Sequence, residues 1–336
     1  MKSNYRYIVK AFMAMAVIAG TTSCDDFLDR EPMSSISPET YYSTAAQLEA
    51  NLNDEYPNVL PSFGQWTYGI FGEDKGTDNQ IEVNANDRYT QDRWKVPHSE
   101  SDNWKFERIY RINFFLSEAL PKFGEDMSGS QNTISGSVAT IKHYIGEMYF
   151  LRAYEYFKKL QLFGDFPIID QPLADEMEAL REASKRFPRN EVARFIISDL
   201  DKAYAYMSDV DMATTRINKD AAMLVKSRVA LFEATWLQNF KGTAFVPGGE
   251  GWPGASLHNN YQYPSGNLDN EVKYFLEQAV EASKLVADKY KGNLTENTGV
   301  LQQSADDPSN PYFDMFAQED LSDVKEVLLW RQYARG

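Results

Sequence analysis

Apolar side chains recur at spacings of three and four residues along six segments of this chain, which is the spacing that gathers them on one face of an α-helix. The six predicted helices lie between Pro38 and Pro57 and over residues 102–120, 138–163, 190–207, 218–240 and 269–290. Pro57 and Pro121 are expected to end the first two helices, and Gly164 the third. Asp269 is the expected N-cap of the last helix. The pattern predicts an all-α fold.

The helices follow one another in pairs, and small residues fall where neighbouring helices would cross. These residues are Ala153, Ala203, Ala230 and Ala279. Paired amphipathic helices that approach closely at small residues are typical of tetratricopeptide-like repeats. We therefore predict a tetratricopeptide-like helical-repeat solenoid with long irregular loops, although no strict sequence period is present.

Two long segments lack helical periodicity, residues 58–101 and 242–268, and both are rich in Gly, Asn and isolated aromatic residues. Long connections of this kind often carry binding residues. An aromatic ring in such a loop can stack on the apolar face of a pyranose. The predicted ligand-binding residues are Trp66, Tyr89, Trp94, Trp252, Tyr261 and Tyr263. The alternative is that these rings only pack within their own loops.

The first residues have the pattern of a bacterial export signal. Lys2, Arg6 and Lys10 precede the apolar run AFMAMAVIAG, and small residues then lead to Cys24. The run is about half of the roughly 20 residues that a membrane-spanning helix needs. Because the chain's only cysteine stands at the end of this signal, we expect residues 1–23 to be removed and Cys24 to be lipidated. The alternative is an ordinary secretory signal followed by a buried cysteine.

Acidic residues follow this cysteine at once, at Asp25, Asp26 and Asp29. This order resembles the surface-export signal of Bacteroidetes lipoproteins, and a solvated tether is the alternative reading. We expect an acidic lipidated tether over residues 24–44 and a helical domain over residues 45–336. The expected location is the cell surface, at the outer membrane.

The overall charge limits the partners. There are 34 basic and 49 acidic residues, for a net charge of -15, and loss of three basic residues with the signal makes it -18. Such a surface repels phosphate backbones, so no nucleic acid partner is expected. It also favours a neutral or weakly charged ligand, unless a local patch around Arg88 and Arg93 counters it. One cysteine and three scattered histidines give no metal-ligand spacing, and no metal or cofactor is expected.

Several stretches together resemble the SusD/RagB family of outer-membrane nutrient-uptake lipoproteins. They are CDDFLDREP, WKFERIYRINFFL, GEMYFLRAYEYFKKLQLFGDFPII, PRNEVARFIISDLDKA, INKDAAMLVKSRVALFEA and NPYFDMF. The resemblance implies a protein that captures an oligosaccharide or related nutrient and delivers it to a SusC-like TonB-dependent transporter. It also implies a helical fold without catalytic residues. Family members are longer, so we expect this chain to lack the C-terminal part of the family.

Two other function classes remain open. Glu73, Asp74 and Asp78 stand together in a Gly-rich loop and could form the carboxylate pair of a glycoside hydrolase. Among 49 acidic residues chance pairs are frequent, so we assign no catalytic residue. A tetratricopeptide-type interaction scaffold without glycan binding is the other class. In either binding class, rigid helical faces rather than loops are expected to contact a protein partner.

Overall fold

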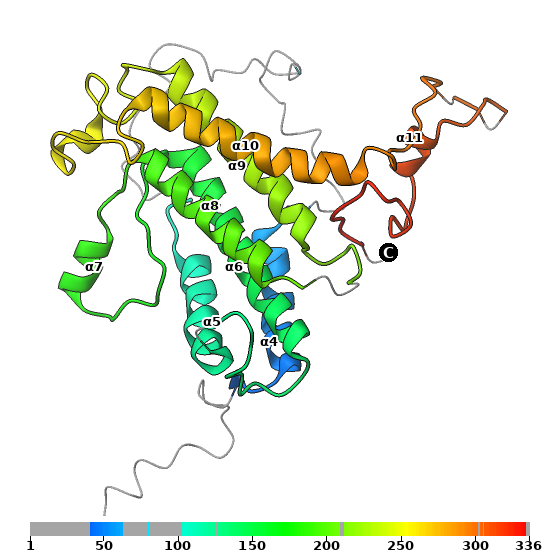
Figure 1. Cartoon of the computed structure of the whole chain (residues 1–336), viewed down its shortest axis with the longest axis horizontal. Helices are drawn as coiled ribbons and strands as arrows, with labels where there is room; N and C mark the ends of the chain where they lie inside the picture. Colours follow the sequence, from blue (N-terminus) through cyan, green and yellow to red (C-terminus); the bar gives the residue numbers. More distant parts are fainter. Residues whose placement is uncertain are drawn as a thin grey trace, which may run out of the picture. The chain divides into compact units, whose positions relative to one another are not determined.

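Figure 1 shows a computed structural model of the chain, which describes residues 41–62, 80, 103–124, 126–208, 212–301, 303–304 and 306–333. The chain divides into two compact units, Met1–Tyr42 and Ser43–Gly336. In the first unit Tyr41 and Tyr42 are described, and their rings meet edge to face at 5.1 Å between centroids. Helices α4 to α11, whose bounds follow, all belong to the second unit. Cys24 and the signal lie outside the described residues.

The described part of the chain is all-α, as the periodicity predicts. Its elements are α4 (Ala45–Val59), α5 (Glu107–Phe123), α6 (Val138–Phe163), α7 (Met177–Ala183), α8 (Arg189–Tyr206), α9 (Lys219–Asn239), the 3-10 turn η3 (Pro253–Ser256), α10 (Leu268–Tyr290) and α11 (Pro311–Met315). Each of the six predicted helices is present, and the short helices α7 and α11 were not predicted. The described residues contain isolated β-bridges and no strand.

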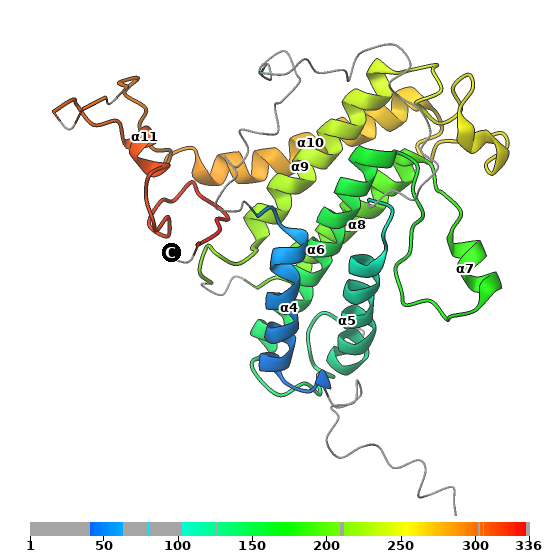
Figure 2. The same cartoon turned by 180° about the vertical axis from the view of Figure 1, so that it is seen from behind.

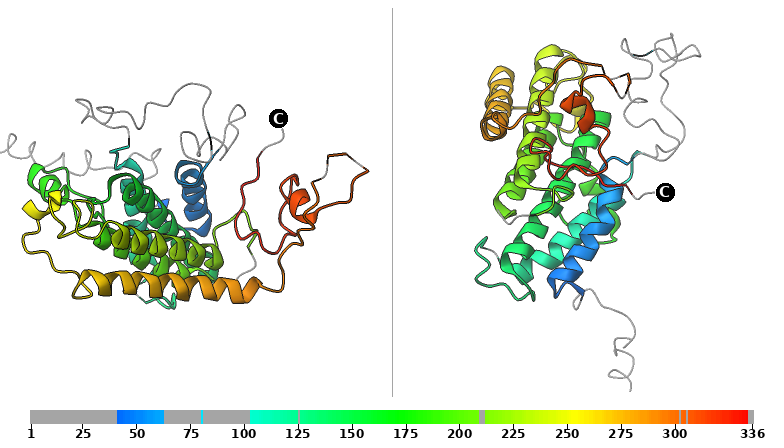
Figure 3. Two further views of the ribbon diagram at one scale, coloured as in Figure 1. Left: turned by 90° about the horizontal axis from the view of Figure 1, so that it is seen from above. Right: turned by 90° about the vertical axis from the view of Figure 1, so that its right-hand side faces the viewer.

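The helices pack in a row that follows the sequence. Helix α6 contacts α4 and α5 on one side and α8 on the other, α8 contacts α9, and α9 contacts α10. Figures 1 and 2 show this row from its two faces, and the right-hand view of Figure 3 shows α10 at its outer edge beside α9. The four alanines expected at helix crossings are all buried: Ala153, Ala203, Ala230 and Ala279. The repeat relationship itself stays a prediction.

The predicted helix ends are partly wrong. Pro57 and Pro121 lie inside α4 and α5, and each helix continues for two residues beyond its proline. A proline this close to the end interrupts few backbone hydrogen bonds, so a further half-turn still forms. The N-cap of α10 is Asn267 and not Asp269, because the Asn267 side chain accepts a hydrogen bond from the Asn270 N–H at 2.8 Å.

A buried charge pair fixes the centre of the row. The Arg152 guanidinium of α6 donates two hydrogen bonds to Asp199 of α8, at 2.6 and 2.8 Å. It also donates to the Asn113 side chain of α5 and to the Asp170 carbonyl, both at 2.9 Å. Because both charged side chains are almost fully buried, these bonds satisfy groups that water cannot reach, and they set the positions of three helices.

Candidate functional site

The end of α6 is where separate segments of the chain converge. Gly164 caps α6 with φ 67° and ψ -103°, in a region of backbone space that favours glycine, and its N–H donates to the Leu160 carbonyl at 2.9 Å. This turn sends the next residue, Asp165, back toward α8. One Asp165 oxygen accepts the Arg189 backbone N–H at 2.9 Å, and the other accepts the Trp252 indole N–H at 2.7 Å. Asp165 therefore joins the ends of α6 and α8 to the α9–α10 loop.

A buried ion pair supports this junction from beneath. The Arg189 guanidinium donates to both oxygens of Glu233 on α9, at 2.9 to 3.2 Å, and Glu233 is fully buried. The same guanidinium lies 4.1 Å from the ring centroid of Trp236. Burial raises the pKa of Glu233, and the bonds from Arg189 oppose that shift. Burial likewise raises the pKa of Asp165, against the bonds from Trp252 and Arg189.

Asp165, Arg189 and Trp252 line a pocket of about 560 Å³, here called the aromatic pocket. Its aromatic lining residues are Phe163, Trp236, Phe245 and Trp252, and its charged lining residues are Asp165, Arg186 and Arg189. Phe245 is 61% exposed at the rim, whereas Trp252 is 5% exposed and forms part of the wall. The pocket thus combines open and buried aromatic rings with a fixed carboxylate and guanidinium groups.

The structure brings the second half of the predicted site together. Trp252, Tyr261 and Tyr263 form a continuous aromatic row, with centroids 5.6 and 5.1 Å apart. The Tyr261 hydroxyl donates to the Asn190 side-chain oxygen at 3.1 Å, and the Tyr263 hydroxyl donates to the Pro247 carbonyl. Of the three, only Trp252 lines the aromatic pocket. Their role in binding a ligand stays a prediction.

The first half of the predicted site, Trp66, Tyr89 and Trp94, lies outside the described residues. Other lining residues were missed by the sequence reasoning. Asp165 belongs to the GDFPII stretch, in which the sequence indicates a helix end and a family resemblance but no binding residue. Trp236 lies in the predicted helix over residues 218–240. Phe245 lies in the same loop as Trp252, and the sequence alone does not show that the Phe245 ring is exposed whereas the Trp252 ring is buried.

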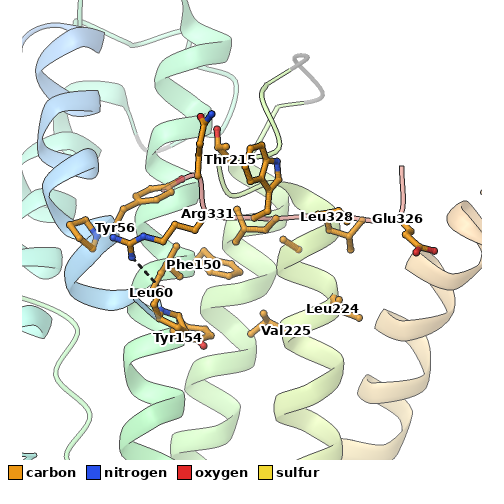
Figure 4. Close-up of a pocket in the computed structure, with 17 residues that line it drawn as sticks. Tyr56, Leu60, Phe150, Tyr154, Thr215, Leu224, Val225, Glu326, Leu328 and Arg331 are labelled. Atoms are coloured by element: carbon orange, nitrogen blue, oxygen red, sulfur yellow. Dashed lines mark hydrogen bonds between the residues drawn. The ribbon is translucent and has the colours of Figure 1, made fainter. Parts of the chain in front are cut away.

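A larger pocket, of about 730 Å³, lies at the other end of α9 and is here called the apolar pocket. Figure 4 shows Phe150 and Tyr154 of α6 lining it beside Leu224 and Val225 of α9, with residues 326–332 running across it. Tyr56 of α4 also lines this pocket, but its hydroxyl donates to the buried Glu147 and accepts the Ile217 N–H at 2.9 Å. The Tyr56 ring therefore adds an apolar wall rather than a free polar group.

Few hydrogen bonds hold the segment across the apolar pocket. The Trp330 backbone N–H and indole N–H donate to the carbonyl and hydroxyl of Thr214, at 3.1 and 2.8 Å. The Asn218 amide donates to the Leu328 carbonyl at 2.6 Å, and Arg331 donates to the Pro61 carbonyl at 3.2 Å. Val327, Leu328, Leu329 and Trp330 are all only half-buried. The segment 327–330, which forms one wall of the apolar pocket, is therefore less buried than Trp252 in the wall of the aromatic pocket.

The model of one protein family, described as "Starch-binding associating with outer membrane", matches residues 26–231. The chain belongs to this SusD-like family. The match confirms the resemblance inferred from the sequence. It includes Asp165 and Arg189 but ends before Glu233, Trp236 and the α9–α10 loop, so the family model covers only one side of the aromatic pocket.

Individual SusD-like proteins share about a quarter of their aligned residues with this chain. SusD-like protein P2 of Formosa agariphila is 25% identical over 253 residues, which cover 72% of this chain and 46% of the relative. SusD-like protein P25 of the same organism is 25% identical and covers 64% of this chain and 41% of the relative. The chain thus spans less than half the length of these relatives.

Two solved structures of SusD-like proteins are also similar to parts of the chain. A SusD-like carbohydrate binding protein from Bacteroides fragilis is 16% identical, with a TM-score of 0.44, over 77% of this chain and 42% of that chain. One from Bacteroides vulgatus is 14% identical, with a TM-score of 0.42, over 77% and 47%. Within the described part of this SusD-like chain, no three His, Cys, Asp or Glu side chains are grouped to hold a metal ion. No described helix is long and apolar enough to cross a membrane.

Proposed function

We propose that the chain binds an oligosaccharide in the aromatic pocket. The observation that carries the proposal is the convergence of Phe163, Trp236 and Phe245 with a fixed carboxylate and guanidinium groups on one pocket of about 560 Å³. This volume falls within the range of about 300–1,000 Å³ that small-molecule sites occupy. Aromatic faces cover the C–H face of a sugar ring, while charged groups orient its hydroxyls. The starch-binding description of the family supports the same ligand class.

The oligosaccharide is bound without cleavage. Glycoside hydrolysis requires two carboxyl groups that face the scissile bond, one of them able to donate a proton. Asp165 lines the aromatic pocket, but both of its oxygens already accept hydrogen bonds. Glu233 lies beneath the pocket, fully buried against Arg189. Neither group is available for that chemistry. The other candidate set, Glu73, Asp74 and Asp78, lies outside the described residues.

A glycan array with the purified protein tests both statements. We expect binding to at least one oligosaccharide, no release of reducing sugar, and a weaker array signal in Phe245→Ala. Phe313→Ala is the matched control, because Phe313 is 48% exposed and does not line the aromatic pocket. An array without hits would support the scaffold function instead. Release of reducing sugar by the wild type but not by a variant lacking all three carboxylates at Glu73, Asp74 and Asp78 would establish hydrolysis.

The chain is held at the outer membrane through a lipid on Cys24. The position of this lone cysteine directly after an export signal supports the proposal, as does the family's association with the outer membrane. Two acyl chains on one residue suffice for stable anchoring. Cys24→Ala should move the protein from the membrane fraction into the soluble fraction and abolish labelling with a radioactive fatty acid. A labelled Cys24→Ala protein, or an unlabelled wild type, would contradict lipidation at this residue.

The bound oligosaccharide is delivered to a SusC-like TonB-dependent transporter, which docks on the helical faces. Helix α10 at the edge of the row supports this role, because Leu276 and Val280 are 37% and 63% exposed there. Val280→Glu should reduce co-purification with the transporter without unfolding the chain. Met177→Glu is the control, since Met177 is 82% exposed on α7. Equal loss of co-purification in both variants would show that α10 is not the interface with the transporter.

A further inference from the structure

A third pocket, of about 590 Å³, adjoins the aromatic pocket at the last turn of α6. The two pockets share Gln161 and Leu162 in their linings, and Leu162 is 53% exposed. A ligand that lies in the aromatic pocket can therefore continue along this turn without leaving the surface. Four cations and two carboxylates line the third pocket, here called the basic pocket: Lys105, Arg108, Lys158, Lys159, Glu107 and Glu155.

The charge of the basic pocket opposes that of the whole chain. Among the described lining residues, four cations less two carboxylates give a charge of +2, whereas the chain as a whole carries -15. Long-range repulsion is screened over about 10 Å at moderate ionic strength, so a local cluster can determine which ligand binds there. The negative charge of the whole chain favours a neutral ligand, but the positive charge of the basic pocket favours an anionic group at that place.

Within the described part of the chain, Arg108 and Lys158 are incompletely neutralised. Glu155 is 3% exposed, and its Oε2 accepts no hydrogen bond within the described residues, with Lys158 and Arg108 at 3.6 and 3.7 Å. Lys159 lies nearer, 3.3 Å from the other Glu155 oxygen, and donates to the Asn103 carbonyl at 2.8 Å. Considering the described residues alone, the half-exposed Arg108 guanidinium makes no hydrogen bond. Arg108 thus retains donors for a ligand.

The environment of Lys158 is consistent with an anion site. Burial lowers the pKa of Lys158, nearby Arg108 and Lys159 add to the shift, and Glu155 opposes it. A bound anion would offset the mutual repulsion of these three cations. Arginine is also suited to bidentate recognition of a carboxylate or sulfate, because its N–H groups form a planar fork.

We propose that the oligosaccharide is acidic, with a sugar ring in the aromatic pocket and a carboxylate or sulfate group on Arg108 and Lys158 in the basic pocket. The proposal rests on the proposed function and specifies its ligand class. Gln161 and Leu162, which line both pockets, carry the connecting part of the ligand. The anionic group provides selectivity, and the aromatic rings bind the sugar whatever its charge.

The test is a calorimetric titration with oligosaccharides of one backbone in three forms, neutral, uronate-containing and sulfated, and with inorganic sulfate alone. We expect an acidic form to bind about tenfold more tightly than the neutral one, the gain typical of one good charge-assisted hydrogen bond. Arg108→Gln should weaken binding of the acidic form and thereby remove this preference. Lys273→Gln, which makes the same charge change at a 72% exposed position on α10, should alter neither. Which acidic form binds tighter distinguishes carboxylate from sulfate.

The outcomes separate this inference from the proposed function. Equal affinity for the three forms, or a preference that survives Arg108→Gln, overturns the acidic ligand while leaving oligosaccharide binding in place. Binding of inorganic sulfate that depends on Arg108, with no oligosaccharide bound, overturns both statements about sugar and leaves an anion site. Circular dichroism of Arg108→Gln excludes misfolding, which we do not expect from a half-exposed side chain without hydrogen bonds to described residues.

Discussion

Trp252 in the aromatic pocket and Trp330 in the apolar pocket both donate a hydrogen bond through the indole N–H, but they differ in what holds them. Trp252 is 5% exposed and donates to the Asp165 carboxylate at 2.7 Å, beside the buried pair of Arg189 and Glu233. Trp330 is half-buried and donates to the Thr214 hydroxyl at 2.8 Å. The larger pocket is thus enclosed by the less rigid wall. Volume alone does not identify a binding site, because orientation of a ligand requires polar groups that are already fixed.

The largest expected effect is on the ion pair beneath the aromatic pocket. Arg189→Met leaves Glu233 buried without a partner, which should reduce the free energy of unfolding by about 3–5 kcal/mol. Lys241→Met breaks the exposed pair with Asp269 and should cost less than about 1 kcal/mol. Urea denaturation of both variants measures the difference. Similar costs for the two would show that the buried pair does not support the pocket.

A direct comparison of the two indole hydrogen bonds should give a smaller effect. Asp165→Ala removes a charged acceptor and should cost about 1.5–3 kcal/mol, whereas Thr214→Val removes a neutral one and should cost about 0.5–1.5 kcal/mol. Hydrogen exchange of the indole protons adds a local readout. The Trp330 indole should exchange faster than that of Trp252 in the wild type. A slower Trp330 would reverse the order of rigidity inferred for the two walls.

The smallest expected effect is a difference between Glu271 and Asp165 in how their contributions to stability depend on pH. Burial would raise the pKa of Glu271, but bonds from Arg194, Asn190 and Ser265 outweigh it and lower the pKa. Its contribution to stability is present above the ordinary value near 4.5 and is lost as pH falls through the lowered pKa. The pKa of Asp165 is raised, so its contribution is present below its ordinary value near 3.8 and is lost as pH rises through the raised pKa.

Glu271→Gln and Asp165→Asn should therefore show opposite trends. The cost of Glu271→Gln in unfolding free energy should shrink as the pH is lowered below about 4.5, and the cost of Asp165→Asn should shrink as the pH is raised from below 3.8. Denaturation series across this range measure both. Parallel trends in the two variants would contradict the assignment of opposite shifts.

The helices could be predicted from the sequence, since periodicity and end signals are local. The predicted range of α6 agrees with the structure because Ser137 caps its start and Gly164 its end. The aromatic pocket could not be predicted in the same way. Arg189 and Glu233 are 44 residues apart, and only the packing of α8 on α9 joins them. The sequence predicts that Trp252 stacks on a sugar ring, which stays a prediction, but it cannot predict that a hydrogen bond to Asp165 holds this side chain in the pocket wall at 5% exposure.

The central claim is that the ligand binds in the aromatic pocket and not in the larger apolar pocket. The most direct measurement is calorimetric titration of an oligosaccharide selected on the glycan array into Phe245→Ala and Leu224→Ala. These residues are 61% and 49% exposed and line the aromatic and apolar pockets respectively, so neither substitution should unfold the chain. We expect Phe245→Ala to weaken binding about tenfold, as the loss of one stacking contact predicts, and Leu224→Ala to leave it unchanged. Weaker binding in Leu224→Ala with wild-type binding in Phe245→Ala would contradict the account.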